Sequence, residues 1–188
     1  MSSKPSLKRL RRMPGDPSRE DMVARMIRVD QAGEYGAKRI YAGQLAVLGR
    51  TKDGPVLKEM ADVEQRHLDT FNDLMVRRHV RPTMLQPFWH VAGFALGAGT
   101  ALLGREAAMA CTVAVEEVIE EHYAHQAARL AHEDEPELKE VVETFGAEEA
   151  EHRETALAHD AREAPGYEPL TAAIKAGSRL AIWLSERF

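Results

Sequence analysis

Apolar residues recur every three or four positions through most of the chain. Four such runs extend over about 20–50, 56–79, 105–133 and 136–163. This repeat is that of an amphipathic helix, and no segment alternates apolar and polar residues strongly enough to indicate a strand. The pattern therefore predicts an all-α protein built around four long helices.

Residues at the ends of these runs support the assignment. Ser18 and Asp21 have the spacing of a capping box at the start of the first helix. Pro136 suits the first turn of the fourth helix, where its missing N–H costs nothing. A fifth segment, 170–188, places its apolar residues along one stripe and is expected to form an additional C-terminal amphipathic helix against the bundle or a membrane surface.

Residues 82–104 contain no Asp, Glu, Lys or Arg. A membrane-spanning helix needs about 20 predominantly apolar residues, but this segment includes two prolines and several glycines. Phe88 and Trp89 suit the interfacial zone of a membrane, and the flanking arginines, such as Arg78 and Arg105, suit lipid phosphates. We expect a hydrophobic helical insert that lies in the membrane interface without crossing it. The alternative is a buried helical hairpin.

Length and composition indicate a single domain. We expect residues 20–188 to form it, because 188 residues lie within the range of one hydrophobic core. A flexible basic tail is expected at 1–19, which holds six of the 25 Lys and Arg residues and one of the 30 Asp and Glu residues. The rest of the chain is acidic, which argues against nucleic acid as a partner. The lone Cys111 excludes an intrachain disulfide and is interpreted as a small core residue.

Two Glu-x-x-His motifs place candidate metal ligands on the predicted helices. Glu64 and His67 lie in the second run, and Glu149 and His152 lie in the fourth. Residues three positions apart face the same side of a helix, so each pair can direct a carboxylate and an imidazole at one ion. Both glutamates fall among apolar residues, where a carboxylate needs a cation. Chance spacing on an exposed face is the alternative.

A single glutamate precedes each motif, so the whole arrangement occurs twice. Glu34 precedes Glu64 by 30 residues and Glu116 precedes Glu149 by 33, with Glu117 as the alternative to Glu116. Ferritin-like di-iron bundles use this arrangement, in which two helices give one Glu each and two give Glu-x-x-His. Four carboxylates and two imidazoles suit Fe(II) or Mn(II) more than zinc, and iron is the redox-capable choice.

Small and polar residues near the candidate ligands predict packing and partners. Glycines on the first helix are expected to let a neighbouring helix approach closely; they are Gly33, Gly36 and Gly43. Candidates for hydrogen bonds to the ligands are Asp30, Tyr35, His122, Tyr123 and His125.

Four strings make the chain similar to a known family. They are IRVDQAGEYGAKRIYAGQLAVLGR at 27–50, RPTMLQPFWHVAGFALGAGTALLG at 81–104, AMACTVAVEE at 108–117 and the final LSERF. On these residues the chain resembles the demethoxyubiquinone hydroxylases of ubiquinone biosynthesis, over nearly everything after residue 20. The family's six metal ligands match Glu34, Glu64, His67, Glu116, Glu149 and His152. The N-terminal leader and the loop at 132–136 depart from the family.

The resemblance implies a ferritin-like monooxygenase. Two iron ions and dioxygen would hydroxylate the ring of a demethoxyubiquinol, with NADH as the ultimate reductant and no catalytic side chain beyond the six ligands. The isoprenoid tail of the substrate would enter between the uncharged insert and the bundle. Further implied partners are membrane lipid and a lipid-binding accessory protein, and a homo-oligomer is left open.

The implied location is peripheral to a membrane. It is the cytoplasmic face of a bacterial cell membrane, or the matrix face of the mitochondrial inner membrane in a eukaryote. A ferritin-like protein that binds and oxidises iron without a quinone substrate is the alternative function, although a soluble iron store would not need the uncharged insert.

Overall fold

Six α-helices and one 3-10 turn make up the part of the chain that the computed structural model describes, residues 15–188, which contains no strand. They are α1 (Arg19–Leu48), α2 (Gly54–Arg78), α3 (Gln86–Leu103), α4 (Arg105–Leu130), α5 (Pro136–Ala158), η1 (Ala161–Glu163) and α6 (Tyr167–Ser185). The prediction of an all-α protein is confirmed. Most of the tail predicted at 1–19 lies outside the described residues, and α1 already begins at Arg19.

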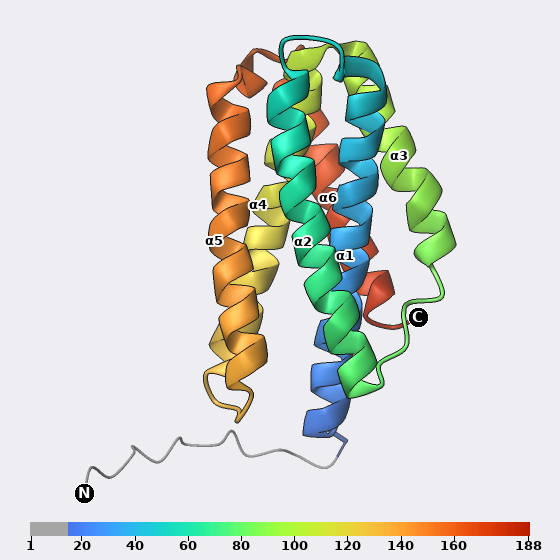
Figure 1. The fold of residues 1–188 in the computed structure, drawn as a ribbon, viewed down its shortest axis with the longest axis vertical. Coiled ribbons are helices and arrows are strands. Elements are labelled where there is room, and N and C mark those ends of the chain that lie inside the picture. Colours follow the sequence, from blue (N-terminus) through green and yellow to red (C-terminus); the bar gives the residue numbers. More distant parts are fainter. Residues whose placement is uncertain (1–14) are drawn as a thin grey trace, which may run out of the picture.

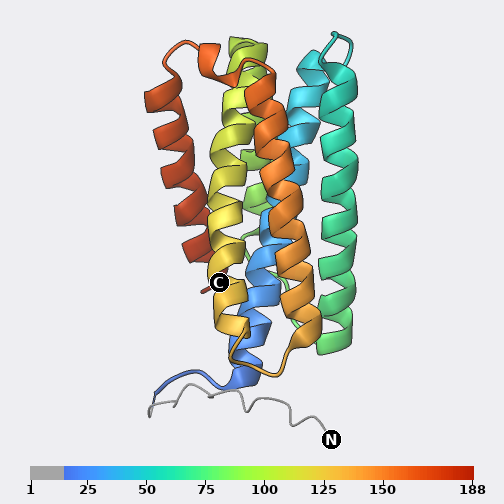
Figure 2. The ribbon, with the colours of Figure 1, turned by 90° about the vertical axis from the view of Figure 1, so that its left-hand side faces the viewer.

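Four of the helices form an elongated bundle, and the other two lie against its outside (Figure 1). Helices α1 and α2 are antiparallel neighbours, as are α4 and α5. Helix α3 packs against α1 and α4 and returns the chain along the length of the bundle before α4 begins. Helix α6 packs mainly against α4, on the side opposite α2 (Figure 2).

The local sequence explains where two of these helices begin. The backbone N–H of Asp21 donates to Ser18 Oγ at 3.0 Å, and the Ser18 hydroxyl donates back to the Asp21 carboxylate at 2.8 Å. The predicted start of α1 at Ser18 is therefore confirmed, although the Asp21 carboxylate accepts from the Ser18 hydroxyl and not from the Ser18 backbone N–H as in a complete capping box. Pro136 occupies the first turn of α5, as its missing N–H favours.

The predicted end of the fourth run, at residue 163, was wrong. Helix α5 ends at Ala158, because Asp160 adopts a left-handed conformation with φ of 63° and stops the α-helical hydrogen bonding. Aspartate tolerates this conformation better than most residues. The turn directs Ala161 into the core, where it is completely buried.

Two apolar clusters fill the bundle on either side of its middle. One gathers large side chains such as Ile27, Phe71 and Phe145, and the other contains Leu57 and Met109. Along each bundle helix, the candidate ligands lie between residues of the first cluster and residues of the second. The middle of the bundle is therefore sealed by apolar packing at both ends.

Helices α1 and α3 touch through their backbones. A Cβ atom on Gly97 would lie 1.9 Å from the carbonyl oxygen of Ile40, and one on Gly43 would lie 2.3 Å from that of Phe94. The close approach predicted at Gly43 is confirmed. Helix α3 also approaches Gly36, because a Cβ on Gly93 would lie 2.9 Å from the Gly36 carbonyl oxygen. At Gly33 the prediction was wrong, because a Cβ there would meet nothing within 4 Å and the residue lines a cavity instead.

The uncharged insert forms a single helix whose outer side is apolar and exposed. Phe88, Val91 and Leu102 of α3 are exposed to 61, 65 and 75%. The alternative of a buried hairpin is therefore wrong. Within residues 15–188, no helix combines the length and apolarity that crossing a bilayer requires.

Arginines at both ends of the insert are engaged by acidic residues of the bundle. Arg78 lies 3.0 Å from the carboxylate of Glu135, and Arg105 lies 3.4 Å from that of Asp53 and also pairs with Asp160. The two guanidinium groups therefore link the ends of α2 and α4 to acidic residues in the loops between other helices. Contact of these arginines with lipid phosphates stays a prediction.

The C-terminal segment forms the expected amphipathic helix. Ile174 is buried against the bundle, whereas Leu180 and Trp183 on other turns of α6 stay exposed. Lys175 and Arg179 of α6 form ion pairs with Glu117 and Glu121 of α4. Charges thus hold α6 beside α4 while part of its apolar surface remains open.

Substitution Gly97→Ala is expected to destabilise the protein, because the added methyl group must push α1 and α3 apart. Overpacking of this kind costs about 1–3 kcal/mol. Gly99 is the matched control on the same helix, since a Cβ there meets nothing within 4 Å. Gly99→Ala should leave the thermal midpoint unchanged or raise it slightly. Equal midpoints for the two variants in circular dichroism would contradict the close contact.

Candidate metal centre

The six predicted ligands converge at the middle of the bundle. They divide into two groups whose donor atoms lie within 4.8 Å of one another. The first group is Glu34, Glu64, His67 and Glu149, and the second is Glu64, Glu116, Glu149 and His152. Glu64 and Glu149 therefore belong to both. All six side chains are buried. One bundle helix supplies each single glutamate, and the other two supply the Glu-x-x-His pairs.

The two carboxylate oxygens of Glu149 face opposite halves of the cluster. Glu149 Oε1 lies 3.1 Å from Nδ1 of His67, and Glu149 Oε2 lies 3.1 Å from Nδ1 of His152. The same nitrogens lie 3.4 Å from Glu34 Oε2 and 3.1 Å from Glu64 Oε1, respectively. Each imidazole therefore directs Nδ1 inward, toward carboxylates from other helices.

The choice between Glu116 and Glu117 is resolved by the orientation of α4. Glu116 is buried and belongs to the cluster, whereas Glu117 is exposed and its carboxylate lies 2.6 Å from Lys175 Nζ. The neighbouring residue points outward because successive positions on a helix are turned by about 100°.

Two buried tyrosines hold the single glutamates. The Tyr123 hydroxyl donates a short hydrogen bond to Glu34, and the Tyr41 hydroxyl donates to Glu116 Oε1 at 2.8 Å. The hypothesis for Tyr123 is confirmed. Tyr41 was not predicted as a partner, although it lies two helical turns from Glu34 on the same face of α1.

The other candidate partners differ in position. His122 and Gln126 of α4 both lie within hydrogen-bonding distance of Asp30, at 3.1 and 2.7 Å, in a network beside the cluster. Tyr35 instead contacts His90 on the outside of α1, and His125 is exposed. The hypothesis of a direct bond to the ligands was therefore wrong for Tyr35 and His125, because their helices turn them outward.

Glu148 is a further residue at the cluster, and it was not predicted from the sequence. Its Oε2 lies 2.5 Å from Nε2 of His67, on the side of the ring that faces away from the other carboxylates. The available signal was its place next to the Glu-x-x-His motif of α5. That signal is weak, because the partner lies on a different helix.

The cluster has too few hydrogen bonds for its buried oxygens. Among residues 15–188, no group has the geometry of a hydrogen bond to either oxygen of Glu64 or to Oε2 of Glu34 and Glu116, although imidazole nitrogens lie close to Glu64 Oε1 and Glu34 Oε2. Buried polar atoms are nearly always paired, since the loss of hydration is otherwise uncompensated. Such carboxylate oxygens, gathered from three helices, are donors that suit divalent cations.

Burial also governs the protonation of the cluster. It raises the pKa values of Glu34, Glu64 and Glu116 above their ordinary value, and the charge of Glu149 raises them further. Burial opposes ionisation of Glu149 too, but hydrogen bonds with His152 and His67 lower its pKa. Although burial disfavours the charged imidazole, bonds to Glu149 and Glu34 raise the pKa of His67 to about 10. Protons therefore take the place of cations in the metal-free protein.

An apolar cavity of about 570 Å³ lies between α1, α3 and α6. Its lining includes Gly33, Gly36 and Ala37, which surround Glu34 in the sequence, together with Leu96 and Ile174 from the outer helices. Val115 and Ile119 of α4 also line it, and among residues 15–188 no charged residue does. The cavity is therefore chemically suited to a hydrocarbon chain.

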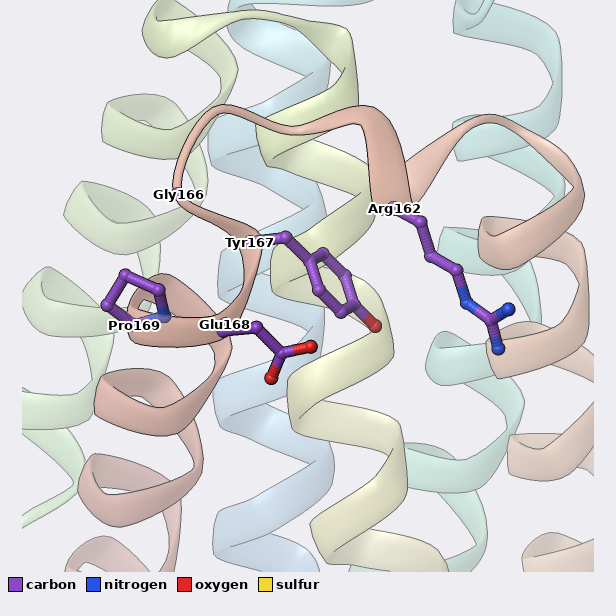
Figure 3. A pocket seen from close by; sticks show the side chains of 5 residues that line it. All are labelled: Arg162, Gly166, Tyr167, Glu168 and Pro169. Carbon is purple, nitrogen blue, oxygen red and sulfur yellow. The ribbon is translucent and has the colours of Figure 1, made fainter.

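A second hollow, of about 610 Å³, lies at the corner between η1 and α6 (Figure 3). Arg162, Tyr167 and Glu168 line this hollow, and the Tyr167 ring lies between the other two side chains. Its lining contains none of the candidate ligands, and this hollow has no evident role in their chemistry.

The chain is similar to hydroxylases from bacteria and eukaryotes. It is 58% identical over 177 residues to the 3-demethoxyubiquinol 3-hydroxylase of Rhodospirillum rubrum, with 94% of this chain and 83% of that relative covered. It is 60% identical over 168 residues to the mitochondrial NADPH-dependent 3-demethoxyubiquinone 3-hydroxylase of Homo sapiens, with 88% and 77% covered. The mitochondrial 5-demethoxyubiquinone hydroxylase of Saccharomyces cerevisiae is 46% identical over 179 residues, with 87% and 77% covered.

A family match agrees with these similarities. The family described as ubiquinone biosynthesis protein COQ7 matches residues 21–185, which include all six predicted ligands and every helix of the bundle apart from the first residues of α1. Because both the family match and the relatives extend over most of the sequence, the chain belongs to the COQ7 family of ubiquinone biosynthesis proteins.

Proposed function

We propose that this protein is a monooxygenase that hydroxylates the ring of demethoxyubiquinol at a centre of two iron ions. The observation that carries the proposal is the buried cluster of carboxylates and imidazoles in a chain whose relatives are named as demethoxyubiquinone hydroxylases. In this proposal six side chains hold the iron ions: Glu34, Glu64, His67, Glu116, Glu149 and His152.

The donor set fits two divalent cations. Four carboxylates balance the charge of two such ions, and the mixed oxygen and nitrogen donors suit iron. Glu34 and His67 would serve one ion, Glu116 and His152 the other, and Glu64 and Glu149 would be shared. When bound, the iron pair supplies electrons to dioxygen, so that one oxygen atom is added to the quinol ring and the other leaves as water.

The surrounding residues have roles of their own. Tyr123 and Tyr41 fix the carboxylates of Glu34 and Glu116 through their hydroxyl hydrogen bonds. Apolar residues above and below, such as Phe71 and Met60, exclude water that would compete with substrate. The protein thus contributes an ordered and dry site.

The apolar cavity is proposed to receive the isoprenoid tail. Its wall of Gly33, Gly36 and Ala37 on α1 is adjacent in sequence to Glu34, so a tail bound there would leave the ring near the cluster. The exposed apolar side of α3, together with the exposed Trp183 of α6, supports peripheral contact with a membrane. Substrate would then pass from lipid to the cavity without crossing water.

Location and partners extend the same proposal. The two eukaryotic relatives described above are named as mitochondrial, and we propose the matrix face of the inner membrane for a eukaryotic chain or the cytoplasmic face of the cell membrane for a bacterial one. A lipid-binding accessory protein and self-association would both use the exposed apolar surface of α3 and α6. Family membership favours the hydroxylase over a ferritin-like protein that only oxidises iron.

Reconstitution tests the reaction directly. The purified protein, loaded anaerobically with Fe(II) and given a reductant, demethoxyubiquinol and air, should convert the quinol to a product heavier by one oxygen atom in mass spectrometry. Label from ¹⁸O₂ should enter the product. Oxidation and accumulation of iron with unchanged quinol would instead establish the ferritin-like alternative.

The same assay distinguishes the reductants. We expect NADH to support turnover, whereas the human relative is named as NADPH-dependent. Initial rates with equal concentrations of the two nucleotides will measure the preference. A rate with NADPH that exceeds the rate with NADH by about tenfold or more, equivalent to about 1.4 kcal/mol, would contradict our expectation.

Substitution His152→Ala should remove one of the two iron ions and abolish hydroxylation, because that ion loses its only nitrogen ligand in the proposed site. Elemental analysis of the reconstituted protein measures the iron content. His125→Ala is the matched control, since His125 is exposed on α4. Full iron content in the His152 variant would count against the proposed ligand set.

The raised pKa of Glu64 predicts how the substitution Glu64→Gln changes the stability of the metal-free protein. The pKa of Glu64 in the folded state exceeds its ordinary value of 4.5, so the stability that the protonated carboxyl contributes is present below pH 4.5 and is lost as pH rises. The neutral amide avoids this loss. Glu64→Gln should therefore stabilise the metal-free protein increasingly from pH 5 to pH 8, by about 1 kcal/mol or more, and weaken metal binding. Chemical denaturation at several pH values measures the difference, and a pH-independent difference would contradict the assignment.

A further inference from the structure

The His67 ring lies between the candidate metal cluster and an additional carboxylate. Its Nδ1 faces Glu149 and Glu34, at 3.1 and 3.4 Å, while its Nε2 lies 2.5 Å from Oε2 of Glu148. Glu148 comes from α5, whereas His67 comes from α2. The contact therefore ties two bundle helices together at the edge of the cluster.

Packing fixes the orientation of this ring. His67 is completely buried, and its ring stacks on that of Phe145 with centroids 3.8 Å apart and planes inclined by 20°. The Glu148 side chain is 29% exposed, and its other oxygen lies 3.7 Å from the Arg66 guanidinium. Glu148 thus occupies the boundary between the buried ring and the surface.

Carboxylates lie beside both nitrogens of His67, so a cation in the cluster decides which nitrogen keeps the proton. A neutral ring has one N–H and one lone pair, and a cation bound at Nδ1 leaves the N–H on Nε2, beside Glu148. With the proton on Nε2 directed at Glu148, the lone pair of Nδ1 points into the cluster. A carboxylate behind a ligating imidazole also increases its basicity toward a metal.

His152 lacks an equivalent partner. Its Nδ1 faces Glu64 and Glu149, each at 3.1 Å. Among residues 15–188 no carboxylate forms a hydrogen bond with its Nε2. The sequence has the same asymmetry, because Glu148 precedes Glu149 on α5 while Val63 precedes Glu64 on α2.

We propose that Glu148 is a positioning residue for His67 and that it makes the two metal positions unequal. The position served by His67 then binds a divalent cation more tightly than the position served by His152. This inference rests on the proposed metal centre. It adds to that centre a residue outside the six ligands and a ranking of the two positions.

Stepwise binding of cobalt(II), a redox-stable substitute for Fe(II), tests the proposal without turnover. Absorption titration of the wild-type protein should give two binding constants. Glu148→Gln should weaken the tighter one by about 10–100-fold, the range found when such partners of ligating histidines are removed. Glu151→Gln is the matched control, because Glu151 carries the same charge on α5 but is exposed.

Combination with histidine variants assigns the effect to one position. In a His152→Ala background, Glu148→Gln should retain its full effect on cobalt affinity. In a His67→Ala background it should have none, because the residue through which Glu148 acts is gone. Equal effects in both backgrounds would overturn the proposal.

A purely structural role gives a different result. If Glu148 only pairs with Arg66 and joins α2 to α5, Glu148→Gln should lower the melting temperature of the metal-free protein and leave both cobalt constants unchanged, which would overturn the inference. Two equal constants in the wild-type protein would also overturn it while leaving the metal centre intact. Fewer than two bound cobalt ions in the wild-type protein would show that the proposed centre itself is wrong.

Discussion

Mutual repulsion among four buried carboxylates is the interaction on which the rest of this structure depends. Glu34, Glu64, Glu116 and Glu149 come from four different helices, so their negative charges would separate those helices unless protons or cations lie between them. The apolar clusters on either side supply the opposing force, because they can be buried only while the helices stay together. The unfavourable repulsion at the middle of the bundle is therefore offset by the favourable burial of apolar side chains on either side of it.

The same constraint explains why the additional helices lie outside. Each interior face of the bundle is occupied by ligands or by the side chains that seal them, so the connection from α2 to α4 cannot pass through the core. It follows the outside of α1 as α3 instead (Figure 1). Helix α6 then covers α4, and the space left between the two outer helices and α1 becomes the apolar cavity.

Features that depend on one helix at a time were predictable from the sequence. Helix positions and the inward side of each Glu-x-x-His pair follow from a period of 3.6 residues. The N-cap at Ser18 follows from a hydroxyl residue placed just before the first periodic residues. Because a single glutamate precedes each pair at a similar spacing, the six candidate ligands could be grouped into one site from the sequence alone. The family strings then added the expected chemistry.

Features that depend on contact between helices were not predictable. Glu148 contacts His67, and Arg78 contacts Glu135, although the two residues of each pair are separated by 81 and 57 positions in the sequence. The end of α5 was misplaced because it depends on the left-handed conformation of Asp160, a residue type that does not by itself mark the end of a helix. Gly33 and Gly43 are the same residue type on the same helix, but of these two only Gly43 contacts the backbone of α3. The reason is that the separation of two crossing helices changes along their length.

The glycine contact between α1 and α3 has a mechanical consequence for the cavity. These two backbones touch at Gly43 and Gly97, so α1 and α3 cannot move closer together at that point. The opposite wall, α6, is fastened by surface charges such as Lys175 with Glu117 and ends in exposed aromatic residues. A guest larger than the cavity would therefore displace α6 more readily than it would separate α1 from α3, because α6 packs less extensively on the rest of the protein than α3 does.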